Sequence, residues 1–153
     1  MGRQAIKDAN PSALVLGPEL GWGAVCNGQF SNYMNLTGSY WDIVTVHYYF
    51  DACTDPGIFM DTGVLPYLQG RPVWMTEMGW NTCDPGYWND GELSQSSGYY
   101  TMLDAFQARR YYWTAILGYD LYEGGGCSWS ILRPDWSNRP AFGTYQYFIA
   151  SYP

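Results

Sequence analysis

The alternation of apolar and polar stretches along the chain predicts short strands separated by helical segments. Four apolar runs are three to six residues long, and each is bounded by polar, Gly or Pro residues, as is typical of buried strands. They lie at residues 13–16, 43–46, 73–75 and 127–132. The first three begin at equal intervals, since 43 − 13 = 30 and 73 − 43 = 30, and each interval suits one β/α unit.

Helices are expected between and after these strands. Residues 98–117 form the strongest candidate, because apolar side chains recur there at helical spacing. Residues 57–69 predict a short, irregular helix that contains Gly63 and Pro66, and residues 139–150 predict a closing helix. Residues 3–9 resemble the tail of another helix. Strands that alternate with helices indicate an α/β fold of parallel β/α units, here one domain over residues 1–153.

The chemistry-bearing side chains follow the predicted strands. Because the carboxyl ends of parallel strands meet at one rim of a sheet, these side chains are expected to converge. They are Glu19 and Trp22 after the first strand, His47, Tyr48 and Tyr49 after the second, Glu77 and Trp80 after the third, and Trp129 with the fourth. Trp22, Trp88 and Trp136 lie in predicted loops and are candidates for outer sugar contacts.

Glu77 stands at the end of an apolar run, where a carboxylate is unusual unless it is paired or used. A structural explanation is an ion pair with Arg71 or Arg133. A functional explanation is catalysis, with His47 and a tyrosine as neighbours. His47 can equally be a core histidine, and Trp80 and Trp129 can simply pack in the interior. These alternatives stay open at the level of the residues.

Composition narrows the classes of partner. The net charge is −7, with only 7 Lys plus Arg, which argues against nucleic acid and anionic membranes. No run approaches the length of a membrane span, and the N-terminus has no apolar region typical of a secretory signal. Aromatic residues make up 19% of the chain, with 15 Tyr and 8 Trp. Exposed Tyr and Trp rings suit flat apolar ligand faces, including those of sugars.

The four cysteines show no metal-binding spacing. There is no C-x-x-C pair and only one His, so a metal site is not expected, and no cofactor is predicted. Cys53 and Cys83 follow neighbouring strands on the same rim, and we expect a disulfide between them. Cys127 is expected to be a buried free thiol at the other end of its strand.

Four segments resemble the second half of the (β/α)8-barrel glycoside hydrolases of clan A. They are AIKDANPSALVLGPELGWG, WDIVTVHYY, RPVWMTEMGW and GGGCSWSIL, which are similar to strands five to eight with their loops, in the manner of families 39 and 5. In that clan a nucleophilic Glu follows strand seven in a T-E-x-G context, which Glu77 matches. A His and a Tyr at strand six match His47 and Tyr49 (or Tyr48), and a Trp under the sugar matches Trp129.

The resemblance implies a half TIM barrel from a retaining glycoside hydrolase that acts on a β-linked oligo- or polysaccharide. The clan's acid/base Glu follows Asn at the end of strand four, and no Asn-Glu pair occurs in this sequence. Glu19, in a G-P-E-L turn, does not match that role. A full barrel needs about 250 residues, so the chain is expected to dimerise, to bind a missing N-terminal half barrel, or to be poorly soluble.

Two alternatives to a glycoside hydrolase remain. One is a non-catalytic carbohydrate-binding half barrel, which would use the same aromatic rim without an acid/base. The other is an inactive fragment with no function. Location is not indicated by the sequence itself, although the resemblance implies an extracellular parent protein.

Overall fold

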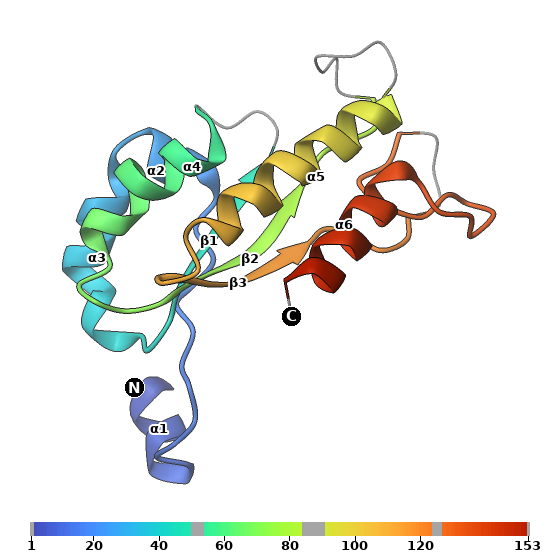
Figure 1. Ribbon diagram of the computed structural model, residues 1–153. Helices are drawn as coiled ribbons and strands as arrows, with labels where there is room; N and C mark the ends of the chain where they lie inside the picture. The colour runs from blue at the N-terminus through green and yellow to red at the C-terminus, as the bar shows by residue number, and fades with distance from the viewer. Residues whose placement is uncertain (1, 50–53, 84–90, 124–126, 153) are drawn as a thin grey trace.

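The computed structural model describes residues 2–49, 54–83, 91–123 and 127–152. At its centre lies a parallel three-stranded sheet in the order β1-β2-β3, formed by Val44–Tyr49, Val73–Gly79 and Trp113–Gly118 (Figure 1). The α/β class and the parallel arrangement are thus confirmed. No helix within the described residues is both long enough and apolar enough to cross a membrane.

Helices follow each strand and flank the sheet. In Figure 1, α5 and α6 run beside one another along the sheet, and α2, α3 and α4 gather at one end of it. The helices are α1 Gly2–Ala9, α2 Trp22–Cys26, α3 Gln29–Thr37, α4 Pro56–Ile58, α5 Gly91–Gln107 and α6 Pro140–Ser151. Irregular helical turns are η1 Gly38–Tyr40, η2 Phe59–Val64 and η3 Leu65–Tyr67. The predicted helix over 57–69 is therefore three short pieces.

Two of the four predicted strands are not regular strands. The first is reduced to isolated parallel bridges, from Leu16 to Ile43 and from Leu20 to Val46. The last, over 127–132, forms no ladder within the described residues, and only Leu132 makes a bridge, to Asn138. The strand beside β2 is instead β3, whose residues fall inside the helix predicted over 98–117.

The helix prediction failed because α5 ends without a Gly or Pro. Apolar residues keep helical spacing through Tyr112 and Ile116, so the pattern hides the turn after Gln107. Arg109 makes that turn: its guanidinium bonds Ala105 O and both oxygens of Asp61, at 2.7–3.0 Å. A tertiary ion pair therefore ends the helix, and this pair cannot be read from local sequence.

One face of the sheet packs against the helices to form the core. The core side chains of the sheet are almost fully buried, and α5 covers them with Tyr99, Met102 and Leu103. Those of the sheet are Val44, Val46, Tyr48, Val73, Met75, Met78 and Trp113. The opposite face of β1 carries Thr45, His47 and Tyr49, as strand alternation requires.

A β-bulge in β2 decides which way Glu77 faces. Val46 pairs with Met75, and His47 pairs with Glu77, so Thr76 is an extra residue opposite no partner. With strict alternation Glu77 would share the buried face of Val73 and Met75. The bulge reverses the alternation, so that Met78 enters the core with 0% exposure and Glu77 lies on the face of His47. The acid at the end of an apolar run is thereby kept out of the core.

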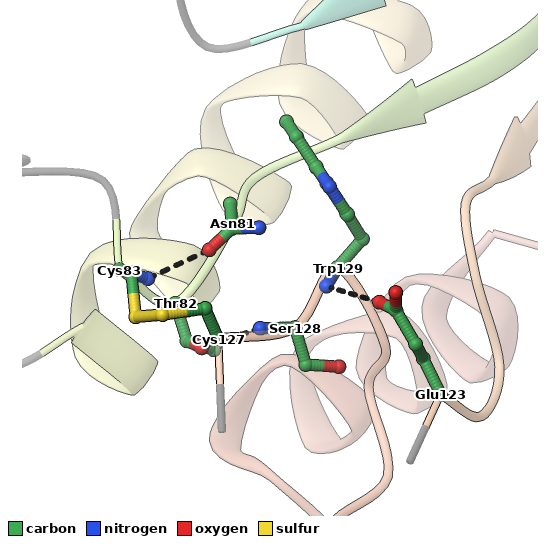
Figure 2. Close-up of a disulfide and its surroundings, with 7 residues drawn as sticks. All are labelled: Asn81, Thr82, Cys83, Glu123, Cys127, Ser128 and Trp129. Carbon is green, nitrogen blue, oxygen red and sulfur yellow. Dashed lines mark hydrogen bonds between the residues drawn. A yellow bond between two sulfur atoms is a disulfide. The ribbon is translucent and has the colours of Figure 1, made fainter. Parts of the chain in front are cut away.

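The disulfide pairing differs from the expectation. Cys83 bonds Cys127, so Cys127 is not a free thiol and a Cys53–Cys83 bond is wrong (Figure 2). Cys53 itself lies outside the described residues, and Cys26 is also disulfide-bonded. The expectation assumed that Cys127 begins a strand. It lies in an irregular segment at the same rim as Cys83 instead.

Helix α1 stands apart from the other helices in Figure 1 and is attached through Asp42. Lys7 Nζ lies 2.7 Å from one oxygen of that carboxylate, which also accepts the Val15 N–H at 2.8 Å, and Arg3 lies 3.3 Å from the other oxygen. The Lys7 contact above all holds the pKa of Asp42 at about 2, below its usual 3.8.

We predict that acid releases α1. Because the pKa of Asp42 is lowered by folding, its contribution is complete above pH 3.8 and is lost as the pH falls through about 2. Amide NMR shifts of residues 2–9 should therefore move toward unfolded values over that interval, ahead of the signals of β1. In Asp42→Asn the same residues should already be released at neutral pH. Helical shifts in that variant at neutral pH would contradict the prediction.

Candidate active site

A pocket of about 390 Å³ opens at the carboxyl end of the sheet. Its lining residues come from four different parts of the chain, which the parallel topology brings to one rim. They are Trp22 at the start of α2, Tyr49 at the end of β1, Glu77 near the end of β2, and Tyr119 and Trp129 after β3. Four of these were candidate site residues of the sequence.

Glu77 is the acidic group of this pocket, and its side chain is 33% exposed. Its Oε2 accepts a short hydrogen bond from the Tyr49 hydroxyl and lies 3.3 Å from His47 Nδ1. Burial, together with the bond to Glu77, raises the pKa of Tyr49, so its hydroxyl stays protonated and donates. No hydrogen bond to Oε1 occurs among the described residues. Within the described residues, the side-chain contacts of Glu77 with Tyr49 and His47 are thus both made by Oε2.

His47 connects Glu77 to a second carboxylate. Its Nε2 lies 3.4 Å from Oε2 of Glu19, although that contact lacks the geometry of a hydrogen bond. Glu19 is the most exposed of the three, with 57% of its side chain accessible. The imidazole therefore has a carboxylate near each ring nitrogen, and of the two acids only Glu77 lines the pocket.

The three groups Glu19, His47 and Glu77 offer ligand atoms within 4.8 Å of one another. Glu77 lies nearest Nδ1 and Glu19 lies nearest Nε2 of the same imidazole. The absence of a metal site stays a prediction.

The structural explanation of Glu77 as an arginine partner finds no support. Arg71 bonds Leu68 O at 2.9 Å and Gln69 at 3.1 Å, whereas Arg133 pairs with Glu92 at 2.6 Å. Neither guanidinium is paired with Glu77.

Aromatic rings form the walls of the pocket. Trp129 meets Tyr49 edge to face, with ring centroids 4.9 Å apart, and Tyr119 meets Tyr49 at 6.4 Å. Tyr119 was missed by sequence reasoning, because β3 was hidden inside a predicted helix. Its place directly after Gly118, at a strand end, is the signal that could have found it. Of the two tyrosines on β1, Tyr48 is in the core and Tyr49 is in the pocket.

Trp80 does not line the pocket. Its ring is 8% exposed and lies in the core near Tyr48 and Tyr99, with centroids 5.9 and 6.4 Å away. Gly98 of α5 permits this position, because a Cβ there would overlap the indole. Trp136 is 64% exposed and stacks on Tyr122, away from the pocket lining. Trp88 lies outside the described residues.

Gly79 lets the aromatic wall approach β2. A Cβ at this position would lie 2.7 Å from the carbonyl oxygen of Tyr119 and 3.2 Å from the Trp129 ring. We predict that Gly79→Ala destabilises the fold by about 1–3 kcal/mol, as overpacking does. Gly143→Ala in α6 is the control, because its Cβ meets nothing within 4 Å and helix propensity favours Ala. Urea unfolding of both variants checks this, and equal midpoints would contradict it.

Comparison with known proteins gives a likeness of fold. No family profile matches the sequence, and no curated protein matches it. Xylanase 10B from Thermotoga petrophila, solved with xylobiose, aligns with 97% of this chain at 13% identity and a TM-score of 0.68, and half (50%) of that chain is covered. The intracellular xylanase TsXylA from Thermoanaerobacterium saccharolyticum, solved with xylotetraose, aligns with 92% of this chain at 16% identity and a TM-score of 0.67. The alignment covers 46% of that chain.

A third structure comes from another glycoside hydrolase family. The GH2 β-galacturonidase from Eisenbergiella tayi, bound to galacturonate, aligns with 99% of this chain at 12% identity and a TM-score of 0.68, over 29% of that chain. The chain thus spans half or less of the length of each of these enzymes. The likeness to family 39 or family 5 is not confirmed. The chain has the fold of a partial TIM barrel, as found in glycoside hydrolases of clan A.

Proposed function

We propose that this chain carries the nucleophile side of a retaining glycoside hydrolase that acts on a β-linked glycan. The observation that carries the proposal is the setting of Glu77. It lies at the end of a barrel strand and in an aromatic pocket, with one oxygen held by Tyr49 and His47. A glycosidase nucleophile requires a fixed, ionised carboxylate that faces a cavity able to hold a sugar ring.

In the proposed reaction, Glu77 Oε1 attacks the anomeric carbon. The bond from that carbon to the glycosidic oxygen breaks, and the oxygen leaves with a proton from a general acid. Water then attacks the same carbon, gives its proton to the conjugate base of that acid, and frees Glu77. The hydrogen bond from Tyr49 fixes the carboxylate plane. Trp129 and Trp22 supply apolar faces for the sugar ring.

The general acid is the part of the machinery that this sequence does not supply. A retaining pair needs carboxyl groups about 5–5.5 Å apart. Glu19 has an oxygen within 4.8 Å of Glu77, but Glu77 lines the pocket and Glu19 does not. We therefore assign Glu19 to the support of His47, and place the acid in the other half of the barrel. Residues 1–153 then form one domain, equivalent to strands five to eight.

The neighbours favour a saccharide substrate, since their structures hold xylobiose, xylotetraose and galacturonate. They do not favour an extracellular location, because one of them is an intracellular xylanase. The Cys83–Cys127 bond does favour an oxidising compartment. Extracellular location therefore stays a prediction. Two features support pairing with a missing N-terminal half barrel or a second copy. Within the described residues no further strand pairs with the outer edge of β3, and Leu117 and Leu121 are exposed there.

The second candidate is a carbohydrate-binding half barrel without catalysis, favoured by the aromatic lining of the pocket and by the lack of an Asn-Glu pair in the sequence. Aryl β-glycosides with nitrophenol leaving groups separate the two, because a good leaving group needs little acid assistance. We expect slow release of nitrophenol from at least one of the β-xyloside, β-glucoside, β-galactoside or β-glucuronide. Oligosaccharide binding in calorimetry without any turnover would establish the binding protein instead.

A further inference from the structure

Trp129, the aromatic wall beside Glu77, belongs to no regular element. The segment over 127–132 forms no strand ladder within the described residues, so a sheet does not fix the place of its backbone. Yet the ring stands edge to face against Tyr49 at 4.9 Å, next to the nucleophile candidate. Other contacts must hold it.

Two of these contacts precede Trp129. Thr82 donates its N–H to Ser128 O at 2.9 Å, and its hydroxyl accepts the Ser128 N–H at 3.0 Å. The Cys83–Cys127 bond closes the pair of segments on the outside, as Figure 2 shows. The Trp129 N–H reaches Glu123 Oε2 at 3.2 Å. These contacts fix the backbone up to residue 129.

Gln95 of α5 holds the backbone at residues 129 and 130. Its Nε2 lies 3.0 Å from Trp80 O and 3.1 Å from both Trp129 O and Ser130 O. The two N–H groups of the amide thus donate to three carbonyl oxygens, and one of the two N–H groups is shared between two of these oxygens. The reverse orientation of the amide would direct its oxygen at three carbonyls, so the assignment is forced.

Gln95 is fully buried, with 0% exposure, in the N-terminal part of α5, ahead of the buried apolar residues Tyr99 and Met102. Its Oε1 meets no donor within the described part of the chain. Burial of such a polar group costs free energy unless its bonds compensate. A leucine would fill the same volume at lower cost, so the amide is explained by what its nitrogen binds. Those acceptors are the backbones of a β2 strand end and of the aromatic wall.

We propose that Gln95 is a positioning residue that fixes the Trp129 wall of the sugar pocket through the backbone of residues 129 and 130. The proposal rests on the proposed function for the meaning of the pocket, but the position of Trp129 can be measured without any substrate. Gln95 is not among the residues that line the pocket, and no hydrogen bond joins it to Glu77. Its loss should therefore weaken saccharide binding more than it slows bond cleavage.

The direct test is fluorine NMR of the chain labelled with 5-fluorotryptophan. Trp129→Phe identifies the Trp129 resonance. In Gln95→Leu we expect this resonance to shift or broaden while the Trp113 resonance, from the core, stays in place. Gln107→Leu, near the other end of α5, is the matched control. An unchanged Trp129 signal would overturn the proposal, and so would an equal change at Trp113, because it would show a general loss of packing.

A second variant separates positioning from space filling. Gln95→Glu keeps the shape, but its ionised form would oppose three carbonyl oxygens. Burial raises the pKa of the introduced carboxyl, and only the protonated form can donate. We expect the Trp129 resonance to be native at acidic pH and displaced as the pH rises, with the parent chain showing no such dependence. A signal that is independent of pH in this variant would contradict positioning by hydrogen bonds.

Kinetics links the two proposals. For the best aryl glycoside, Gln95→Leu should raise KM about tenfold and change kcat little, in keeping with a displaced aromatic platform. A fall in kcat with unchanged KM would refute the positioning role. If the parent chain turns over no glycoside at all, the proposed function fails, and the fluorine data still decide whether Gln95 places Trp129.

Discussion

Replacement of Glu77 by Gln will lower the turnover of aryl β-glycosides by about 10⁴-fold or more, the scale of loss seen when a catalytic nucleophile is removed. The amide keeps the shape and can still meet Tyr49 and His47, but it cannot form the glycosyl ester. Nitrophenol release at saturating substrate measures the effect. Asp104→Asn, which removes an exposed carboxylate from α5, is the control and should retain full activity.

A smaller side chain makes the test specific. In Glu77→Ala the vacated space admits azide, which can attack the anomeric carbon in place of the carboxylate. We expect azide to restore turnover and to give a glycosyl azide of inverted configuration, whereas the parent chain retains configuration. Activity in Glu77→Gln equal to that of the parent would reject the nucleophile role. Retained configuration in the azide product would reject direct displacement in the same pocket.

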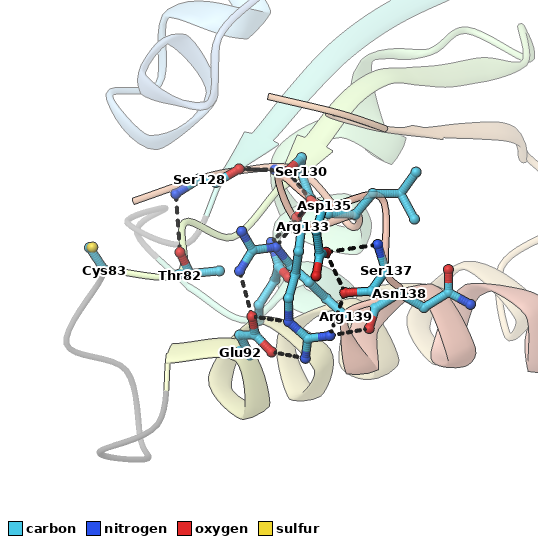
Figure 3. A network of polar contacts seen from close by, with 12 residues as sticks. Thr82, Cys83, Glu92, Ser128, Ser130, Arg133, Asp135, Ser137, Asn138 and Arg139 are labelled. Carbon is cyan, nitrogen blue, oxygen red and sulfur yellow. Dashed lines mark hydrogen bonds and ion pairs between the residues drawn. The ribbon is translucent and has the colours of Figure 1, made fainter. Parts of the chain in front are cut away.

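Loss of Glu92 will destabilise the fold by about 3–5 kcal/mol, as removal of one partner from a buried ion pair does. Glu92, in the first turn of α5, accepts from Arg133 at 2.6 and 2.9 Å and from Arg139 at 2.7 Å (Figure 3). Only 5% of the Arg139 side chain is exposed. In Glu92→Leu that guanidinium would stay buried without its carboxylate. Urea unfolding followed by far-UV circular dichroism measures the change.

The control for this prediction also removes the Arg139 guanidinium, which Glu92→Leu alone would leave buried without a carboxylate. Glu92→Leu combined with Arg139→Met should recover much of the lost stability, because the desolvation cost of Arg139 disappears with it. Arg133→Met alone should cost less than Glu92→Leu, since Arg133 is 39% exposed. A double variant no more stable than Glu92→Leu would show that the ion pair is not the source of the effect.

The sequence predicted the parts of the fold that depend on local pattern. Both β1 and β2 are short apolar runs between turn residues, and α6 begins with Pro140 at its first turn, so each follows from the residues themselves. The meeting of Glu77, His47 and Tyr49 also followed, because parallel strands end at the same rim. Topology predicted the shared rim, but the face of the sheet on which Glu77 lies is set by the bulge at Thr76, which the sequence pattern did not indicate.

The parts that failed depend on contacts between distant residues. The turn before β3 is made by Arg109 and Asp61, which are 48 positions apart. Trp80 enters the core because Gly98 leaves room for its ring. Cys83 finds Cys127 because an irregular segment returns to the rim. Each feature depends on tertiary contacts, which produce no periodic pattern in the sequence.

The bulge at Thr76 makes the face on which Glu77 lies depend on its register with β1. Val46 lies opposite Met75 and His47 lies opposite Glu77, so Thr76 is the one residue between them that the ladder does not need. Deletion of Thr76 would leave Met75, Glu77 and Met78 in regular alternation, with the carboxylate still on the pocket face and Met78 still in the core. In an evolving gene, loss of this one codon would therefore leave both side chains on the faces that they occupy now.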